Sequence, residues 1–284
     1  MPSRVSHAPL TPFGVAVTLD RSGPLSDADK DELRRLYELD GLLVFHDLRL
    51  SVEEQMEICS IFGPVLRKEA FVVSNTRDDG AFGNTELLFH SDIPYVPAPY
   101  WAGSLYGIEV AGEVSATRFA SGLRAYERLP QKLRDRVEGL NSVQVRQRRP
   151  ERRNRLTDAW PTDNCAVQPV VGRQRGTGRP YLFTGAWHTA CIIGLSEAES
   201  DALLAELFSY IHAEDNIYDH VWKTGSMVIW DNLAVQHARK EITGGTRTLQ
   251  RVSIAEYSCG DQYPIDRPSE EDLKAYTRLG GSRS

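Results

Sequence analysis

The sequence of 284 residues contains few cysteines, no long apolar run and no surplus of basic residues. None of its four cysteines belongs to a Cys-x-x-Cys pair, which argues against a structural zinc site and favours reduced thiols. No stretch approaches the roughly 18 consecutive apolar residues of a membrane-spanning helix. With 33 Lys and Arg against 39 Asp and Glu, the formal net charge is -6, which argues against a dedicated nucleic-acid-binding protein.

The amino-terminal residues also lack the apolar core of a secretory signal peptide. No internal repeat or low-complexity segment divides the chain, and its 41% hydrophobic and 25% charged residues are typical of globular proteins. We therefore expect one continuous domain over residues 1–284, located in the cytoplasm. Neither nucleic acid nor a membrane is expected as its partner.

Local signals predict a mainly β protein with a few helices. Ser26, Ser51 and Ser196 are suitable N-caps, and Glu54 and Glu199 complete capping boxes with Ser51 and Ser196. The helices are predicted over residues 27–39, 51–63, 125–140 and 196–213. Strands are predicted over residues 42–45, 86–89, 103–110, 115–120, 180–184, 226–230, 233–238 and 246–257. Many short strands with few helices are typical of a β-sandwich or barrel that carries flanking helices.

Two segments far apart in the sequence carry residues that suit a divalent metal. His90 and Asp92 point to the same face of a predicted strand, because side chains alternate along a strand. His237 lies on a second predicted strand and could add another imidazole. Two histidines and one carboxylate leave three metal positions open, as in non-haem Fe(II) oxygenases. Taken singly, a chance His-x-Asp pair and a core histidine remain alternatives.

Two arginines near the carboxyl end of the sequence indicate an anionic ligand. Arg247 and Arg251 share one face of a predicted strand, roughly 13 Å apart at about 3.3 Å per residue. Guanidinium groups on an inward face are costly without anionic partners, and their planar fork suits carboxylates. Two surface arginines on an exposed face are the alternative interpretation.

A third basic feature is the arginine-rich segment 145–155, which contains six arginines. It is either a solvated insertion or a lid whose positive field attracts an anionic substrate. The sequence leaves both interpretations open.

In order and approximate spacing, these motifs resemble the taurine dioxygenase (TauD/TfdA) family of Fe(II)- and 2-oxoglutarate-dependent dioxygenases. The resemblance covers nearly the whole chain. Its motifs are Asp40-Gly-Leu-Leu-Val-Phe45, Phe62-Gly-Pro64, His90-Ser-Asp92, Trp230-Asp-Asn232 with His237, and the pair Arg247 and Arg251.

The resemblance implies a double-stranded β-helix, which is a jelly roll of the clavaminate synthase-like type with flanking helices. It implies that His90, Asp92 and His237 bind Fe(II), and that Thr117 and Arg247 bind the cosubstrate 2-oxoglutarate. O2 is the other cosubstrate. The retained carboxylate argues against the halogenating relatives, which replace it with a small residue.

The resemblance also suggests substrate contacts. Arg251 matches an arginine that holds the acidic group of the primary substrate in several relatives. Glu86 stands where taurine dioxygenases often have an uncharged polar residue, and even spacing places it on the face of His90, so taurine is a doubtful substrate. Tyr95 could line an apolar wall. His188 matches a pocket histidine of relatives near the phenoxyacetate herbicide enzymes.

We therefore expect an enzyme that hydroxylates a small organic anion, a carboxylate or sulfonate, and releases succinate and CO2. One alternative is a biosynthetic oxygenase or desaturase whose amino-acid-like substrate meets Glu86 through its amine. A remote alternative is a non-catalytic sensor that binds metal and 2-oxoglutarate. The resemblance is also compatible with a homo-oligomer.

Overall fold

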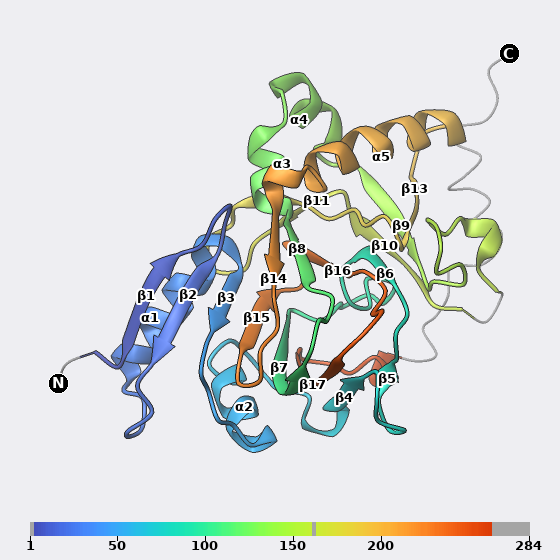
Figure 1. Ribbon diagram of the computed structural model, residues 1–284. Coiled ribbons are helices and arrows are strands. Elements are labelled where there is room, and N and C mark those ends of the chain that lie inside the picture. Colours follow the sequence, from blue (N-terminus) through green and yellow to red (C-terminus); the bar gives the residue numbers. More distant parts are fainter. Residues whose placement is uncertain (1–2, 161–162, 263–284) are drawn as a thin grey trace, which may run out of the picture.

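The computed structural model describes residues 3–160 and 163–262, and two facing β-sheets form its centre (Figure 1). The larger sheet consists of β1 (Val5–Pro9), β2 (Val15–Leu19), β3 (Leu42–Phe45), β4 (Phe71–Ser74), β5 (Ala81–Phe82), β7 (Ala102–Ala111), β15 (Met227–Asp231) and β17 (Thr246–Ile254). Its strand order is β1-β2-β3-β15-β7-β17-β4-β5. The predicted boundaries of the domain, residues 1 and 284, lie outside the described residues.

The smaller of the two facing sheets carries most of the candidate site. It consists of β6 (Leu87–His90), β8 (Thr117–Ser121), β14 (Ile217–His220) and β16 (Val235–Arg239), in the order β14-β8-β16-β6. A separate three-stranded sheet contains β9 (Asn141–Val145), β10 (Cys165–Pro169) and β13 (Thr189–Ile192). A further pair consists of β11 (Val171–Arg173) and β12 (Pro180–Leu182).

Helices flank the sheets at one side and one end (Figure 1). They are α1 (Asp27–Asp40), α2 (Val52–Cys59), α3 (Gly122–Arg128), α4 (Gln131–Val137) and α5 (Glu197–Ile211). Short 3-10 turns occur at Arg67–Glu69, Leu156–Asp158, Glu214–Asn216 and Gly260–Gln262. This mainly β arrangement with flanking helices confirms the predicted fold class. In the described part of the chain, none of the helices is both long and apolar enough to cross a membrane.

Three predicted helix starts are confirmed, because helix caps are local. Ser26, Ser51 and Ser196 each accept a hydrogen bond from the backbone N–H three residues later, and the acidic side chain at that position accepts one from the backbone N–H of the cap residue. The start predicted at residue 125 is wrong, since α3 begins at Gly122. The single helix predicted over residues 125–140 is wrong. Pro130, which has no N–H to donate, separates α3 from α4.

The strands predicted from the sequence occur with shifted ends. The strand predicted to reach residue 257 ends at Ile254, and that predicted over 115–120 begins only at Thr117. The strands that the sequence analysis did not predict are β1, β2, β4, β5, β9, β10, β11, β13 and β14. Aromatic side chains fill the space between the two main sheets below the site. Phe119 and Trp230 are fully buried there, with ring centroids 5.5 Å apart.

Candidate active site

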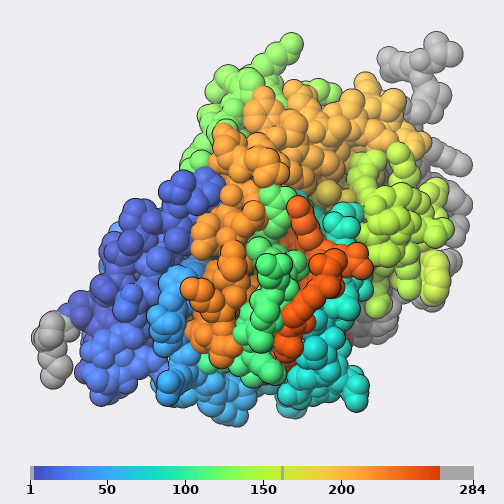
Figure 2. All heavy atoms as spheres, in the orientation of Figure 1, coloured from blue at the N-terminus to red at the C-terminus, as the bar shows by residue number. Residues whose placement is uncertain are grey.

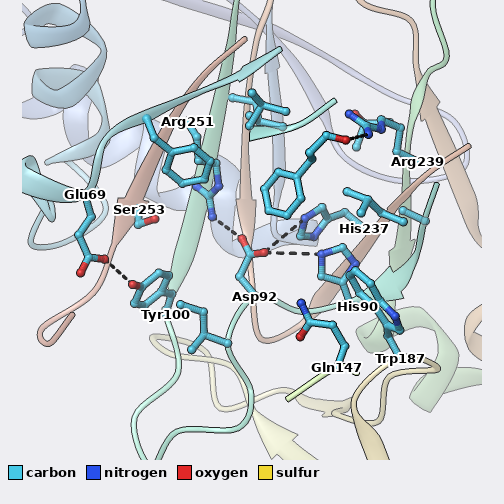
Figure 3. Close-up of a pocket in the computed structure, with 18 of the residues that line it drawn as sticks. Glu69, His90, Asp92, Tyr100, Gln147, Trp187, His237, Arg239, Arg251 and Ser253 are labelled. Atoms are coloured by element: carbon cyan, nitrogen blue, oxygen red, sulfur yellow. Dashed lines mark hydrogen bonds and ion pairs between the residues drawn. The ribbon is translucent and has the colours of Figure 1, made fainter. Parts of the chain in front are cut away.

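Three side chains able to bind a metal converge between the two main sheets (Figure 3). His90 ends β6, Asp92 follows it, and His237 lies opposite His90 in the antiparallel ladder of β16 and β6. Asp92 Oδ1 lies 3.6 Å from Nε2 of His90 and 3.7 Å from Nε2 of His237. One ligand atom from each residue lies within 4.8 Å of the others. This donor set and spacing fit a metal with one face of its coordination shell held by protein.

The protonation states of both imidazoles suit metal binding. Nδ1 of His90 lies 2.6 Å from the carbonyl oxygen of Leu88. Because a carbonyl only accepts, Nδ1 carries the proton, and Nε2 keeps its lone pair for a metal. Burial lowers the pKa of His237 to about 3, so this imidazole is neutral at physiological pH.

The backbone of Asp92 is held in place by Asn232, which is fully buried. The amide N–H of Asp92 donates to Asn232 Oδ1 at 2.7 Å, and Asn232 Nδ2 donates to the Asp92 carbonyl at 3.0 Å. The same Nδ2 donates to the carbonyl of Tyr100 at 2.9 Å. The asparagine of the Trp-Asp-Asn motif therefore positions a candidate metal ligand 140 residues away in the sequence.

Arg251 supports the other end of the same residue. Its Nη2 donates to Asp92 Oδ2, the carboxylate oxygen that faces away from the histidines (Figure 3). Burial would raise the pKa of Asp92, but Arg251 and the two histidines outweigh it and hold the pKa well below its usual range. The guanidinium also lies over the Trp230 ring, 4.8 Å from its centroid. Contact of Arg251 with an acidic substrate stays a prediction.

A second group of polar residues offers only hydrogen-bond donors to the cavity. Thr117 Oγ1 accepts hydrogen bonds of 2.9 Å from Arg247 Nη2 and from Trp222 Nε1. Since both lone pairs of the hydroxyl are used, its own O–H is left to donate. Arg247 is 2% exposed, and burial lowers its pKa to about 9. A buried cation beside a donating hydroxyl suits a carboxylate.

Arg239, which was not predicted as a site residue, lies two residues after His237 and lines the same cavity. The residue is 3% exposed. The spacing from His237 was a usable signal, because residues two apart on a strand share a face. Gln147 and Trp187 also line the cavity and were missed, since they lie on connecting segments without a regular pattern.

The metal-binding residues and this donor group line one cavity of about 490 Å³, a size that suits a small organic ligand. Tyr95 and His188, both predicted substrate contacts, line it too. His188 Nδ1 lies 3.0 Å from the Val145 carbonyl, and burial lowers the His188 pKa to about 3. The neutral ring therefore has Nε2 free to accept a hydrogen bond. The apolar lining residues are Ala70, Phe71, Val73, Phe82, Leu87, Ile93, Leu105, Trp187 and Ala238.

The structure does not bring Glu86 to the site. Its side chain is exposed, and it is not among the residues that line the cavity. The prediction assumed even alternation from Glu86 to His90. The ladder pairs His237 with His90 but Arg239 with Leu87, so β6 contains an extra residue there. This bulge places Leu87, instead of Glu86, on the cavity side with His90.

The arginine-rich segment forms a lobe beside α5, drawn in yellow-green in Figure 2. Its arginines contact carboxylates within the lobe and on α5. Arg148 pairs with Asp163, Arg152 with Asp158, Arg153 with Asp201, and Arg155 with both Glu197 and Asp201. These pairs offset the positive charge of the segment, so its density of arginine does not by itself create an anion site.

Comparison with known proteins agrees with this geometry. Residues 6–253 match the taurine catabolism dioxygenase TauD, TfdA family. The chain is 31% identical to an (S)-phenoxypropionate/alpha-ketoglutarate-dioxygenase of Sphingobium herbicidovorans, with 88% of this chain and 92% of the relative covered. It is 28% identical to an alpha-ketoglutarate-dependent 2,4-dichlorophenoxyacetate dioxygenase of Cupriavidus pinatubonensis, with 86% and 94% covered.

A solved structure shows the same fold. AAD-2, in complex with Mn(II) and N-oxalylglycine, superimposes with a TM-score of 0.76 at 22% identity, over 89% of this chain and 98% of that one. The predicted jelly roll is thus confirmed. From its sequence match, its fold and its two-histidine, one-carboxylate cluster, the chain belongs to the TauD/TfdA family of 2-oxoglutarate-dependent dioxygenases.

Proposed function

We propose that this dioxygenase hydroxylates a small organic anion with an apolar body, and that it releases succinate and CO2. His90, Asp92 and His237 bind Fe(II), while Thr117 and Arg247 bind the distal carboxylate of 2-oxoglutarate. The observation that carries the proposal is the arrangement of one cavity, which has a three-ligand metal cluster and a separate group of donors for a carboxylate.

When bound, iron and 2-oxoglutarate supply the oxidising chemistry, in which O2 is consumed and the cosubstrate loses CO2. The chain's own residues provide geometry and exclude water. Asn232 and Arg251 fix the backbone and the outer oxygen of Asp92, and the carbonyl of Leu88 fixes the tautomer of His90.

The lining of the cavity supports the substrate class. Phe71 and Phe82 are 39% and 48% exposed, with ring centroids 6.4 Å apart, and both line the cavity. Such a rim suits an aryl or alkyl body. We place the acidic group of the substrate against Arg251, which lies beside the metal-binding carboxylate. The two named relatives act on aryloxyalkanoates, so an aryloxy carboxylate is the first compound class to test.

Tyr95 and His188 also line the cavity, with ring centroids 5.4 Å apart. Because His188 accepts a hydrogen bond at Nε2, it suits an O–H or N–H group of the substrate better than a carboxylate. We further propose that the partner is a small molecule, with neither nucleic acid nor a membrane involved, and that the protein acts in the cytoplasm.

The test begins with anaerobic addition of Fe(II) and 2-oxoglutarate to the metal-free protein. We expect the visible charge-transfer band of the chelate, and succinate release when an aryloxyalkanoate and O2 are added. Alkylsulfonates and amino acids complete the panel. A folded protein without the band would contradict the assigned cofactor site. A band without substrate-dependent succinate release from any compound would favour the non-catalytic sensor.

A second candidate is an oxygenase for an amino-acid-like intermediate, favoured by one carboxylate inside the cavity. Glu69 lines it and accepts a hydrogen bond from Tyr100 (Figure 3). Glu69, in place of the exposed Glu86, is the residue that could meet an amine. If amino acids are substrates, Glu69→Gln should raise their KM at least about tenfold, the loss of one charge-assisted hydrogen bond, while Glu86→Gln leaves it unchanged.

A further inference from the structure

We propose that Arg239 is a second cationic ligand of the distal carboxylate of 2-oxoglutarate, beside Arg247. The inference rests on the proposed function, and it adds a residue to the cosubstrate site that the family resemblance did not assign.

The register of the strands places Arg239 at this end of the cavity. It pairs with Thr117 across β16 and β8, so the two side chains lie on the same face of the smaller sheet. Arg247 reaches the same hydroxyl from the larger sheet, through the hydrogen bond from its Nη2 to Thr117 Oγ1. The two guanidinium groups therefore approach one threonine from two sheets.

No carboxylate among the described residues compensates the charges of these two arginines. Both line the cavity, at 3% and 2% exposure, and in the described part of the chain neither contacts a carboxylate. Their Nε atoms are buried without a hydrogen-bond partner among the described residues. Two such cations favour an anion between them.

Arg239 is also held in a fixed orientation. Its Nη2 donates to the carbonyls of Phe82, Gly83 and Thr85, at 3.1, 3.1 and 2.5 Å. Neutral carbonyls position the guanidinium but do not neutralise it. Because a planar guanidinium has donors on more than one edge, Nε remains for a carboxylate while Nη2 is occupied by the turn.

The competing explanation is that Arg239 only anchors the turn formed by residues 82–85. An anchor would affect any 2-oxo acid to the same degree, because loss of the turn changes the whole cavity. A carboxylate ligand affects only a cosubstrate that carries the distal carboxylate. The probe that separates the two is 2-oxopentanoate, which has the same chain length as 2-oxoglutarate but ends in a methyl group.

The experiment measures the Kd of both compounds by anaerobic titration of the charge-transfer band of the Fe(II) protein, for wild type, Arg239→Gln and Arg239→Lys. We expect Arg239→Gln to raise the Kd of 2-oxoglutarate about tenfold, as for one charge-assisted hydrogen bond, and to leave that of 2-oxopentanoate within about twofold. Arg239→Lys should recover part of the loss, because it keeps the charge.

Arg118→Gln is the matched control, since Arg118 follows Thr117 on β8 and pairs with Glu214 and Asp219. It should change neither Kd. Equal losses for both compounds, or no loss for either, would overturn the role of Arg239 and leave the proposed function standing. A wild-type protein that shows no band with 2-oxoglutarate would overturn both proposals together. Thermal unfolding of each variant verifies that it folds.

Discussion

Arginines of segment 145–155 and arginines of the cavity are the same residue type in opposite electrostatic surroundings. Arg153 and Arg155 both contact Asp201 on α5, so their charge is met within the protein. Arg239 and Arg247 are buried and, among the described residues, contact no carboxylate. The difference teaches that an anion site is indicated by cations without an internal counter-charge. The local density of arginine in the sequence indicates it poorly.

Arg251 lies between these two cases. It is buried in the cavity like Arg247, yet it has a carboxylate partner, and that partner is the candidate metal ligand Asp92. Its charge is therefore tied to the metal site. Removing a counter-charge or a cation from either region therefore tests this comparison.

The largest effect is expected from Asp92→Ala, which removes a metal ligand and leaves Arg251 as unpaired as Arg247. Fe(II) affinity should fall by more than about 100-fold, beyond the range typical of residues that only support a ligand. Anaerobic calorimetry with Fe(II) measures this. Asp158→Asn, which removes a paired carboxylate in the arginine-rich lobe, should leave metal affinity unchanged. A loss of tenfold or less would contradict the assignment of Asp92.

Arg247→Gln should have the next largest effect, since it removes an uncompensated cation from the donor group. The Kd of 2-oxoglutarate should rise about 30- to 100-fold, corresponding to about 2–3 kcal/mol of charge-assisted hydrogen bonding. The same band titration measures it. Arg153→Gln, at a cation with its own partner, serves as the control. Equal Kd values in the two variants would erase the distinction between paired and unpaired arginines.

Arg251→Gln should lower Fe(II) affinity about tenfold, because the outer oxygen of Asp92 loses its partner. If Arg251 also holds the acidic group of the substrate, KM for that substrate rises even when Fe(II) is saturating. Metal calorimetry and steady-state kinetics at high Fe(II) separate the two roles. Unchanged metal affinity would show that the pair with Asp92 does not support the metal site.

The smallest effect is expected from Asp201→Asn, which removes ion pairs between α5 and the arginine-rich lobe and acts on stability alone. Burial would raise the pKa of Asp201, but Arg153 and Arg155 outweigh it, so the pKa is lowered on folding. The contribution to stability is therefore present above the unfolded value near pH 4 and lost as the pH falls below it. Asp201→Asn should cost up to about 1 kcal/mol, or roughly 2–4 °C in Tm, at pH 7.

At pH 3 the Tm difference between wild type and Asp201→Asn should shrink, which differential scanning calorimetry can follow. The Kd of 2-oxoglutarate should not change. A change in that Kd would show that the lobe acts on the cavity after all, as a lid would.

The sequence predicted what local patterns and ordered motifs determine. The helix caps at Ser26, Ser51 and Ser196 depend on residues three apart, and all are confirmed. The proximity of His90, Asp92 and His237, expected from the family resemblance, agrees with the structure. The roles assigned to Thr117 and Arg247 stay predictions, although the two side chains do contact each other.

What failed depended on long-range or irregular structure. The position of Glu86 was mistaken because a bulge in β6 cannot be seen in an alternating pattern. Pro130 is a local signal against a continuous helix, and the prediction of one helix over residues 125–140 did not take it into account. The pairing of Arg251 with Asp92 joins residues 159 apart, and the lack of a carboxylate partner for Arg239 among the described residues is a property of the packed cavity alone.

The hydrogen bonds between Asn232 and the backbone of Asp92 have a consequence for when the protein can acquire iron. A chain is synthesised from its amino terminus, so His90 and Asp92 emerge before Asn232 and His237 have been made. Asn232 follows Asp92 by 140 residues. If His90, Asp92 and His237 bind iron as proposed, we expect the early pair to hold metal weakly, because it lacks His237 and the hydrogen bonds from Asn232. We therefore expect iron to bind only to the nearly complete polypeptide, and a truncated translation product that stops before β16 to form no metal centre.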